Sequence, residues 1–131
     1  MNRVLICGDR NWTNRETIRA WIEKLIDWGY HTVIEGEAKG ADTIAREEAE
    51  RAGMIVFKYP AKWDEYRQKY PVEKFGMKFK SAGTDRNTQM LVEGKPSLVV
   101  AFHPDISKSK GTKNMIKQAK KTGIETILVE E

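Results

Sequence analysis

Small residues ahead of two predicted helices could form sites for an anion. The stretch EGEAKGAD, residues 35–42, places Gly36, Gly40 and Ala41 beside the start of a helical pattern. Free backbone N–H groups and the helix dipole attract phosphate at such a start. Asp42 would compete for the same N–H groups, so it could instead shape the loop or accept a hydrogen bond from a ribose hydroxyl. The spacing fits neither a Walker A loop nor Gly-x-Gly-x-x-Gly, and a plain tight connection stays open.

A similar arrangement occurs in KGTKNM, nearer the C-terminus. Gly111 and Thr112 precede another helical pattern, where Thr112 could cap the helix or donate its hydroxyl to a phosphate. Lys108 and Lys110 add positive charge just before it. Capping without any ligand is the alternative interpretation.

Two arginines in other loops could neutralise a phosphate. In CGDRNW, Gly8 permits a close approach of the backbone to a ligand, and Arg10 could hold a phosphate through two parallel hydrogen bonds. In GTDRNTQM, Arg86 and Asn87 are expected at a helix start, where the pair could hold an anion and read a polar edge. For Arg10, the alternative is a surface arginine after an ordinary turn.

Aromatic side chains close to these positions could stack on a base. Trp12 follows Arg10, although packing against the domain would also explain it. Segment 62–80 interleaves aromatic residues, Trp63 and Tyr66 among them, with lysines and an arginine. This mixture suits contact with a nucleotide or with single-stranded nucleic acid. A short helix that packs its aromatic side against the core or a partner subunit is the alternative.

Metal-binding and nucleophilic patterns do not emerge from the sequence. His31 and His103 are far apart along the chain, and Cys7 is the only cysteine. We therefore expect no metal and no cofactor, and no Ser-His-Asp or Cys-His arrangement. Cys7 lies within an apolar run and is expected to be a small buried side chain.

Five apolar or β-branched runs must position these loops. They cover residues 4–7, 32–34, 54–57, 98–102 and 126–129. Their continuous apolar character is typical of parallel strands covered on both faces. Helices are expected after a Thr13–Glu16 capping box, from Asp42 as an N-cap, over residues 82–92 and after Thr112.

The alternation of strands and helices predicts the fold class. It indicates a single Rossmann-like, doubly wound α/β domain over residues 1–131, with about five parallel strands and helices on both faces. Segment 62–80 is long for a connection and is expected to be an insertion or lid. In such sheets ligands bind outside the carboxyl ends of the strands, where the strand order reverses. The loops discussed above all follow a predicted strand or lead into a predicted helix at that edge.

Composition and charge limit the class of protein. The chain has 131 residues, of which 40% are hydrophobic and 32% charged, as expected of one soluble globular domain. It has no recognisable signal peptide and nothing near the roughly 18 apolar residues of a membrane span, so we expect a cytoplasmic protein without membrane contact. Residues 1–61 carry a net charge of −1 and residues 62–131 a net charge of +5. The basic half could meet an anion or could be a solvated lysine-rich surface.

The ordered set of motifs resembles one family. CGDRNW, GEAKGADTIAREEAERAG, DRNTQML, PSLVVAFHP and GTKNMIKQAKKTGI together resemble the YspA/YpsA-related branch of the SLOG superfamily, which also includes the LOG phosphoribohydrolases and DprA. The resemblance implies a Rossmann-like domain that binds nucleotide-derived ligands over the strand ends. It implies the site residues Gly8, Arg10, Gly36, Gly40, Ala41, Asp42, Arg86, Asn87, Gly111 and Thr112. One position departs, because Met115 stands where LOG-type enzymes have a glutamate.

Three functions are consistent with these features. The first is binding of a nucleotide-like small molecule by a sensor or sequestering module. The second is a nucleoside-phosphate N-glycosidase or phosphoribohydrolase, whose carboxylate would come from Asp9, Glu35, Glu37, Asp42 or Asp85 because Met115 cannot transfer a proton. The third is a single-stranded DNA- or RNA-binding module that uses segment 62–80. Assembly into a homo-oligomer stays open.

Overall fold

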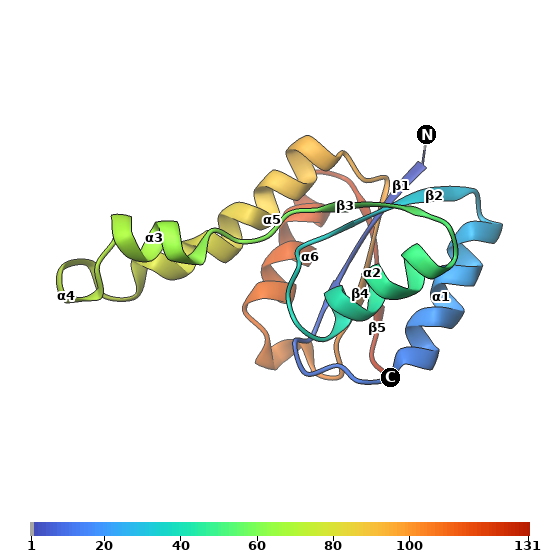
Figure 1. The fold of residues 1–131 in the computed structure, drawn as a ribbon, viewed down its shortest axis with the longest axis horizontal. Helices are drawn as coiled ribbons and strands as arrows, with labels where there is room; N and C mark the ends of the chain where they lie inside the picture. Colours follow the sequence, from blue (N-terminus) through green and yellow to red (C-terminus); the bar gives the residue numbers. More distant parts are fainter. Residues whose placement is uncertain (1) are drawn as a thin grey trace.

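A twisted sheet of five parallel strands forms the centre of the molecule (Figure 1). The computed structural model describes residues 2–131. The strand order is β3-β2-β1-β4-β5. All strands are parallel, and the order in which the chain adds them reverses between β1 and β4, because β2 and β3 lie on one side of β1 and β4 and β5 on the other. The strands are β1 (Asn2–Gly8), β2 (Tyr30–Glu35), β3 (Ile55–Lys58), β4 (Leu98–Phe102) and β5 (Glu125–Val129). The predicted parallel, doubly wound sheet is therefore confirmed.

Helices cover both faces of this sheet. Two helices on one face, α1 (Arg15–Asp27) and α2 (Ala41–Arg51), pack with Val4 and Ile6 of β1 in one apolar cluster. On the other face, α5 (Ser81–Gly94) and α6 (Gly111–Lys121) pack with Leu5 and Cys7 in a second cluster. Successive side chains of a strand point to opposite faces, so one apolar run supplies both cores. Each fully buried aliphatic side chain contributes about 1.5–3 kcal/mol.

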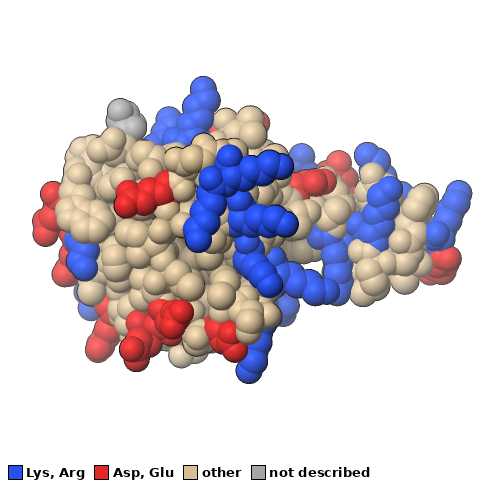
Figure 2. All heavy atoms as spheres, turned by 180° about the vertical axis from the view of Figure 1, so that it is seen from behind, with Lys and Arg blue, Asp and Glu red and all other residues tan. Residues whose placement is uncertain are grey.

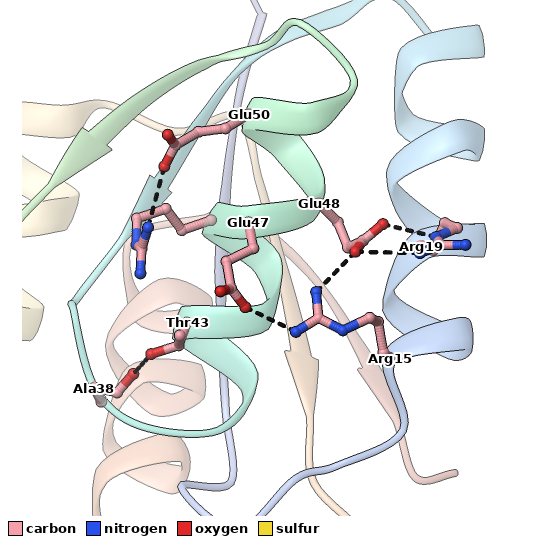
Figure 3. Close-up of polar contacts among 8 residues, drawn as sticks. Arg15, Arg19, Ala38, Thr43, Glu47, Glu48 and Glu50 are labelled. Carbon is pink, nitrogen blue, oxygen red and sulfur yellow. Dashed lines mark hydrogen bonds and ion pairs between the residues drawn. The ribbon is translucent and has the colours of Figure 1, made fainter.

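Ion pairs join α1 to α2 on the first face (Figure 3). Arg15 donates to Glu47 and Glu48, both at 2.8 Å, and Arg19 Nε donates to Glu48 at 2.7 Å. The Glu48 side chain is only 4% exposed, and these hydrogen bonds lower its pKa to about 2. This cluster orients α2, whose N-terminal turn lies at the carboxyl edge of the sheet.

Three predicted helix starts are wrong in detail. The N-cap of α1 is Asn14, whose Oδ1 accepts from Thr17 N, so the Thr13–Glu16 capping box does not form. Asp42 does not cap α2, which begins at Ala41 after Gly40 without a side-chain cap. Thr112 does not cap α6; its N–H instead donates to Ser109 Oγ at 3.0 Å.

The helix predicted over residues 82–92 is present as α5, but the placement of Arg86 and Asn87 at a helix start is wrong. This helix begins at Ser81 and continues to Gly94, so Arg86 and Asn87 lie in its second turn and not at its N-terminus. The reason is that the preceding chain is already helical. A 3₁₀ turn, η1 (Gly76–Lys80), leads directly into α5.

Segment 62–80 forms a helical arm that extends away from the sheet (Figure 1). It contains α3 (Trp63–Lys69), α4 (Val72–Phe75) and η1, and none of these elements buries a residue completely. Tyr66 Oη donates to Asp85 Oδ2 of α5 at 2.6 Å, and the Trp63 ring lies against Gly83. The arm is therefore joined to the N-terminal half of α5. Among the residues that the structure describes, no helix is long and apolar enough to cross a membrane.

Candidate ligand-binding site

A pocket of about 330 Å³ lies where the carboxyl ends of β1 and β4 meet. These neighbouring strands pair in parallel from Val4 and Leu98 to Gly8 and Phe102. The chain leaves β1 toward one face and β4 toward the other, which makes this edge the switch point where such sheets bind ligands. The pocket is lined by Cys7, Gly8, Asp9, Arg10, Asn11, Ala38, Asp42, Arg86, Asn87, Met90, His103, Lys108, Ser109, Lys110, Gly111, Thr112 and Met115.

Gly8 lets the ends of the two strands come close together. The Asp9 N–H donates to Phe102 O at 2.8 Å. A Cβ atom at position 8 would collide with that carbonyl oxygen and lie 2.8 Å from the Cβ of Ala41. The glycine predicted as a site residue is therefore required by the packing of β1, β4 and α2 around the pocket.

The loop after β2 uses its own N–H groups internally. Asp42 Oδ2 accepts from Gly36 N at 3.1 Å and from Ala38 N at 3.3 Å. Thr43 Oγ1 donates back to Ala38 O at 2.7 Å (Figure 3). Asp42 thus folds the loop back onto the start of α2. This agrees with the alternative from the sequence that Asp42 shapes the loop.

Ala41 and Gly40 support the neighbouring loop. Ala41 N–H donates to Asp9 O at 3.1 Å, so it already has an acceptor. Gly40 has φ +75°, and a Cβ atom there would collide with the carbonyl oxygens of Asp9 and Arg10. Gly36, Gly40 and Ala41 are not among the residues that line the pocket. The structure therefore does not bring these three residues into the lining of the pocket, and their predicted contact with phosphate stays a prediction.

Arg86 and Asn87 link the end of β2 to the start of α6. Arg86 Nη1 donates to Gly36 O, and its Nε donates to Asn87 Oδ1 at 3.2 Å. Asn87 Nδ2 donates to Gly111 O at 3.1 Å and to Asn114 Oδ1 at 3.2 Å. Both residues line the pocket, although the sequence had placed them at a helix start. These hydrogen bonds hold both side chains in place.

The N-terminus of α6 forms the opposite wall. Thr112 N–H is taken by Ser109 Oγ. No hydrogen bond among residues 2–131 uses the N–H groups of Gly111 or Lys113, which belong to the first turn. A Cβ atom on Gly111 would meet nothing within 4 Å. This helix start is therefore open to an anion.

The charge of the lining is positive. Four cationic residues, Arg10, Arg86, Lys108 and Lys110, face two acids, Asp9 and Asp42. Lys108 lies 3.9 Å from Asp105, and Arg10 forms no ion pair with the residues described. An excess of cationic side chains at an open helix N-terminus favours a negatively charged ligand.

Burial changes the protonation of the acidic groups here. It raises the pKa of Asp42 to about 6, although the Arg86 charge and the N–H groups of Ala38 and Gly36 act in the opposite direction. Glu35, completely buried at the end of β2, has a pKa raised by burial and by the neighbouring acids Glu37 and Asp42. Burial likewise raises the pKa of the Cys7 thiol, which fits its expected role as an inert buried side chain.

The predicted stacking residues lie away from this pocket. Trp12 is 7% exposed, packs edge-on against Phe102 at 5.6 Å between ring centroids, and donates through Nε1 to Asn14 O. Trp63 and Tyr66 belong to the arm. The structure does not bring these three side chains together with the phosphate-binding candidates.

Sequence reasoning missed His103 and Ser109. Both line the pocket; His103 is 6% exposed and accepts from Asp105 N through Nδ1 at 3.0 Å. A neutral His103 consequently carries its proton on Nε2. The position of His103 immediately after β4 could have indicated that it lies at the pocket. Among the residues described, no group of three His, Cys, Asp or Glu side chains could hold a metal ion.

Comparison with known proteins decides the family. The sequence model of the YspA, cpYpsA-related SLOG family matches residues 2–66. The Gene 61 protein of Mycobacterium phage D29 is 31% identical over 134 residues, which cover 97% of this chain and 95% of that protein. The chain belongs to the YspA, cpYpsA-related SLOG family. The family resemblance read from the motifs is therefore confirmed.

A solved structure shares the fold of this chain over more residues than the family model matches. The X-ray structure of DNA processing protein A (DprA) from Streptococcus pneumoniae superposes with a TM-score of 0.71 and 19% sequence identity. The match covers 98% of this chain but 50% of the DprA chain. It includes the part of the SLOG domain after residue 66, where Arg86, Asn87, Gly111 and Thr112 lie. At this identity the similarity concerns the fold.

Proposed function

We propose that this SLOG protein binds a nucleotide or nucleotide-derived phosphorylated ligand in the pocket over β1 and β4, as a sensor or sequestering module. The observation that carries the proposal is the open N-terminus of α6 within a pocket of net positive charge. The volume of about 330 Å³ lies at the small end of the range for ligand pockets. A nucleoside monophosphate is therefore a better match than a larger dinucleotide.

The phosphate is assigned to the α6 side of the pocket. The N–H groups of Gly111 and Lys113 would donate to its oxygens, and Arg10 and Lys110 would neutralise its charge. Arg86 lies nearer the loop after β2, where its guanidinium is already held by Gly36 O. The sugar would then extend from α6 toward Arg86 and Asp42.

Hydrolysis of the ligand is less well supported. Met115 lines the pocket with 1% exposure, and a thioether cannot transfer a proton. Of the five carboxylates considered from the sequence, Glu35, Glu37 and Asp85 are not in the lining. Asp9 and Asp42 are the acids that a bound ligand could reach.

Calorimetry with the four ribonucleoside 5′-monophosphates tests the proposal. Wild type should bind at least one of them with a micromolar to low-millimolar Kd, and Arg10→Ala or Lys110→Ala should weaken it roughly tenfold. Arg51→Ala is the control, because Arg51 is exposed at the far end of α2. Absence of binding to wild type at millimolar ligand overturns the proposal. Release of free base during the titration, followed by chromatography, would identify a hydrolase instead.

Single-stranded nucleic acid is a second candidate, favoured by the surface charge. Figure 2 shows lysine and arginine side chains gathered on one face of the molecule and continuing along the arm. α6 carries four lysines and no acidic residue. Its Gln118 contacts Thr88 of α5, whose N-terminal half bears the arm. The SLOG-fold relative DprA is named for DNA processing, which agrees with this candidate.

Salt dependence tests the second candidate. Binding of a labelled single strand should weaken steeply with salt, because each phosphate contact releases counterions and contributes about −0.7 to the slope of log K against log salt. The Lys117→Ala/Lys121→Ala variant removes two such contacts and should reduce the steepness of that slope by about 1.4. A flat salt response, or no retention of the strand by wild type, overturns this candidate.

A further inference from the structure

The two carboxylate oxygens of Asp42 have different surroundings. Oδ2 accepts both hydrogen bonds from the loop, from Gly36 N and Ala38 N. No hydrogen bond among residues 2–131 ends on Oδ1, although the residue as a whole is only 4% exposed. One oxygen therefore holds the loop and the other is unused.

The unused oxygen is accessible from the pocket. Among the residues described, the only completely buried side-chain nitrogen or oxygen without a hydrogen-bond partner is Arg46 Nε, which forms an ion pair with Glu37. Asp42 Oδ1 has no hydrogen-bond partner either, yet it is not one of the completely buried atoms. It must therefore be in contact with open space. Asp42 lines the pocket, so that space is the pocket itself. A nearly buried carboxylate thus presents one acceptor to a ligand.

The chemistry of this acceptor limits what can lie against it. An ionised carboxylate only accepts hydrogen bonds, and it repels a phosphate. The ligand group beside Asp42 must therefore be a neutral or cationic donor. In a nucleotide whose phosphate lies at Gly111, the sugar hydroxyls are donors between the phosphate and the rest of the molecule.

We propose that Asp42 Oδ1 accepts a hydrogen bond from a ribose hydroxyl, which makes the pocket selective for ribonucleotides over 2′-deoxyribonucleotides. This inference rests on the proposed nucleotide-binding function. A site that hydrogen-bonds a ligand hydroxyl discriminates against an analogue that lacks it, because the buried acceptor then loses water without gaining a partner. Arg86 supports this role, since its positive charge favours the ionised form of Asp42.

The loop geometry provides a variant that changes only the pocket side of the residue. In Asp42→Asn, the N–H groups of Gly36 and Ala38 require the amide oxygen to occupy the Oδ2 position. The amide NH₂ then takes the Oδ1 position, where it no longer accepts. Asp42→Ala would be unsuitable, because it removes the acceptor that holds the loop.

Calorimetry with matched ribose and 2′-deoxyribose pairs of the four nucleoside 5′-monophosphates tests the inference. Wild type should prefer the ribose member by about tenfold or more, whichever base binds best. Asp42→Asn should reduce this preference to about threefold or less while retaining the affinity for the deoxy member within a similar factor. Circular dichroism and thermal denaturation establish that the variant is folded.

The outcomes separate this inference from the proposed function. Equal binding of both sugars by wild type overturns the ribose assignment and leaves nucleotide binding intact. A preference that follows the base and not the sugar also overturns it, since Asp42 would then contact a base amine. Absence of binding by either sugar overturns the proposed function and the ribose assignment with it. The wild-type comparison alone decides the inference if Asp42→Asn fails to fold.

Discussion

Arg86 Nη1 donates a hydrogen bond to the main-chain oxygen of Gly36, a residue fifty positions earlier in the chain. The contact joins the second turn of α5 to the loop after β2, beside the pocket. It fixes the Arg86 guanidinium and keeps its charge close to Asp42. Position 36 must therefore be small, although its backbone is not among those with positive φ.

Gly36→Ala should weaken nucleotide binding with little loss of stability. The added Cβ atom would collide with Arg86 Nη1, which is the end of a flexible side chain and can move away. Displacement of the guanidinium should lower affinity by roughly tenfold in calorimetry, as should Arg86→Ala. The double variant should bind only slightly worse than Arg86→Ala alone, since the collision is with Arg86 and the remaining contact, 3.0 Å from Asp42 Oδ2, is the milder one. Additive losses would contradict this explanation.

Substitutions of two glycines should separate backbone strain from a collision. Gly53 has φ +83° and an added Cβ atom would meet nothing within 4 Å, so Gly53→Ala should cost about 1–2 kcal/mol from the left-handed backbone alone. Gly40 has φ +75° and an added Cβ atom would also meet the carbonyl oxygens of Asp9 and Arg10. Gly40→Ala should therefore cost roughly 3 kcal/mol or more in urea unfolding. Equal losses would show that the loop after β1 yields to the extra atom.

The sequence predicts the elements of this fold well because their signals are local. Apolar runs mark the strands, and the switch-point rule selects the loops after β1 and β4, where Arg10 and Gly111 do line the pocket. The partners of individual N–H groups depend on contacts between distant segments. Ala41 N–H donates to Asp9 O, and no pattern within EGEAKGAD indicates this bond.

Asp42 illustrates the difference between a local sequence signal and the contacts that the fold creates. Its position before an apolar helical pattern predicted an N-cap, since short polar side chains commonly cap helices. In the structure the carboxylate instead reaches backward to the N–H groups of Gly36 and Ala38. Arg86 and Asn87 were misplaced in a similar way. They were expected at a helix start, but η1 leads directly into α5 and they lie in its second turn.

Tyr66→Phe should loosen the arm without destabilising the sheet. Tyr66 Oη donates to Asp85 Oδ2 at 2.6 Å, a contact that raises the pKa of Tyr66 to about 12. Loss of this bond should make trypsin cleavage within residues 62–80 roughly fivefold faster, since local opening becomes about 1 kcal/mol easier. The thermal midpoint should hardly change, because α3, α4 and η1 contain no buried residue.

Tyr70→Phe is the matched control for this experiment. Tyr70 packs edge-on against Tyr66 and Phe75, at 6.0 and 5.5 Å between ring centroids, and its hydroxyl forms no hydrogen bond within residues 2–131. Trypsin should therefore cleave the Tyr70→Phe variant at the same rate as wild type. If both variants are cleaved at the same rate, the bond to Asp85 does not hold the arm.

Glu35→Gln should make the protein more stable than wild type at alkaline pH. Glu35 is completely buried, and both of its carboxylate oxygens accept from Glu37 N, at 3.1 and 3.0 Å. Burial, the Glu37 side chain and the Asp42 charge raise its pKa from 4.5 to about 8. The folded protein therefore retains a proton that the unfolded chain releases between these two values. Its contribution to stability is complete below about pH 4.5 and is lost as the pH rises through about 8.

Urea unfolding at pH 5, 6.5 and 8.5 measures this effect. Glutamine keeps an acceptor for Glu37 N and has no proton to lose, so the variant should gain on wild type by roughly 1–3 kcal/mol between the lowest and the highest pH. Glu23→Gln is the control, because Glu23 is exposed on α1 and its difference from wild type should stay constant. A constant difference for Glu35→Gln as well would mean that Glu35 is ionised in the folded protein. The buried negative charge at the end of β2 would then need Arg46 or Arg86 as its counterion.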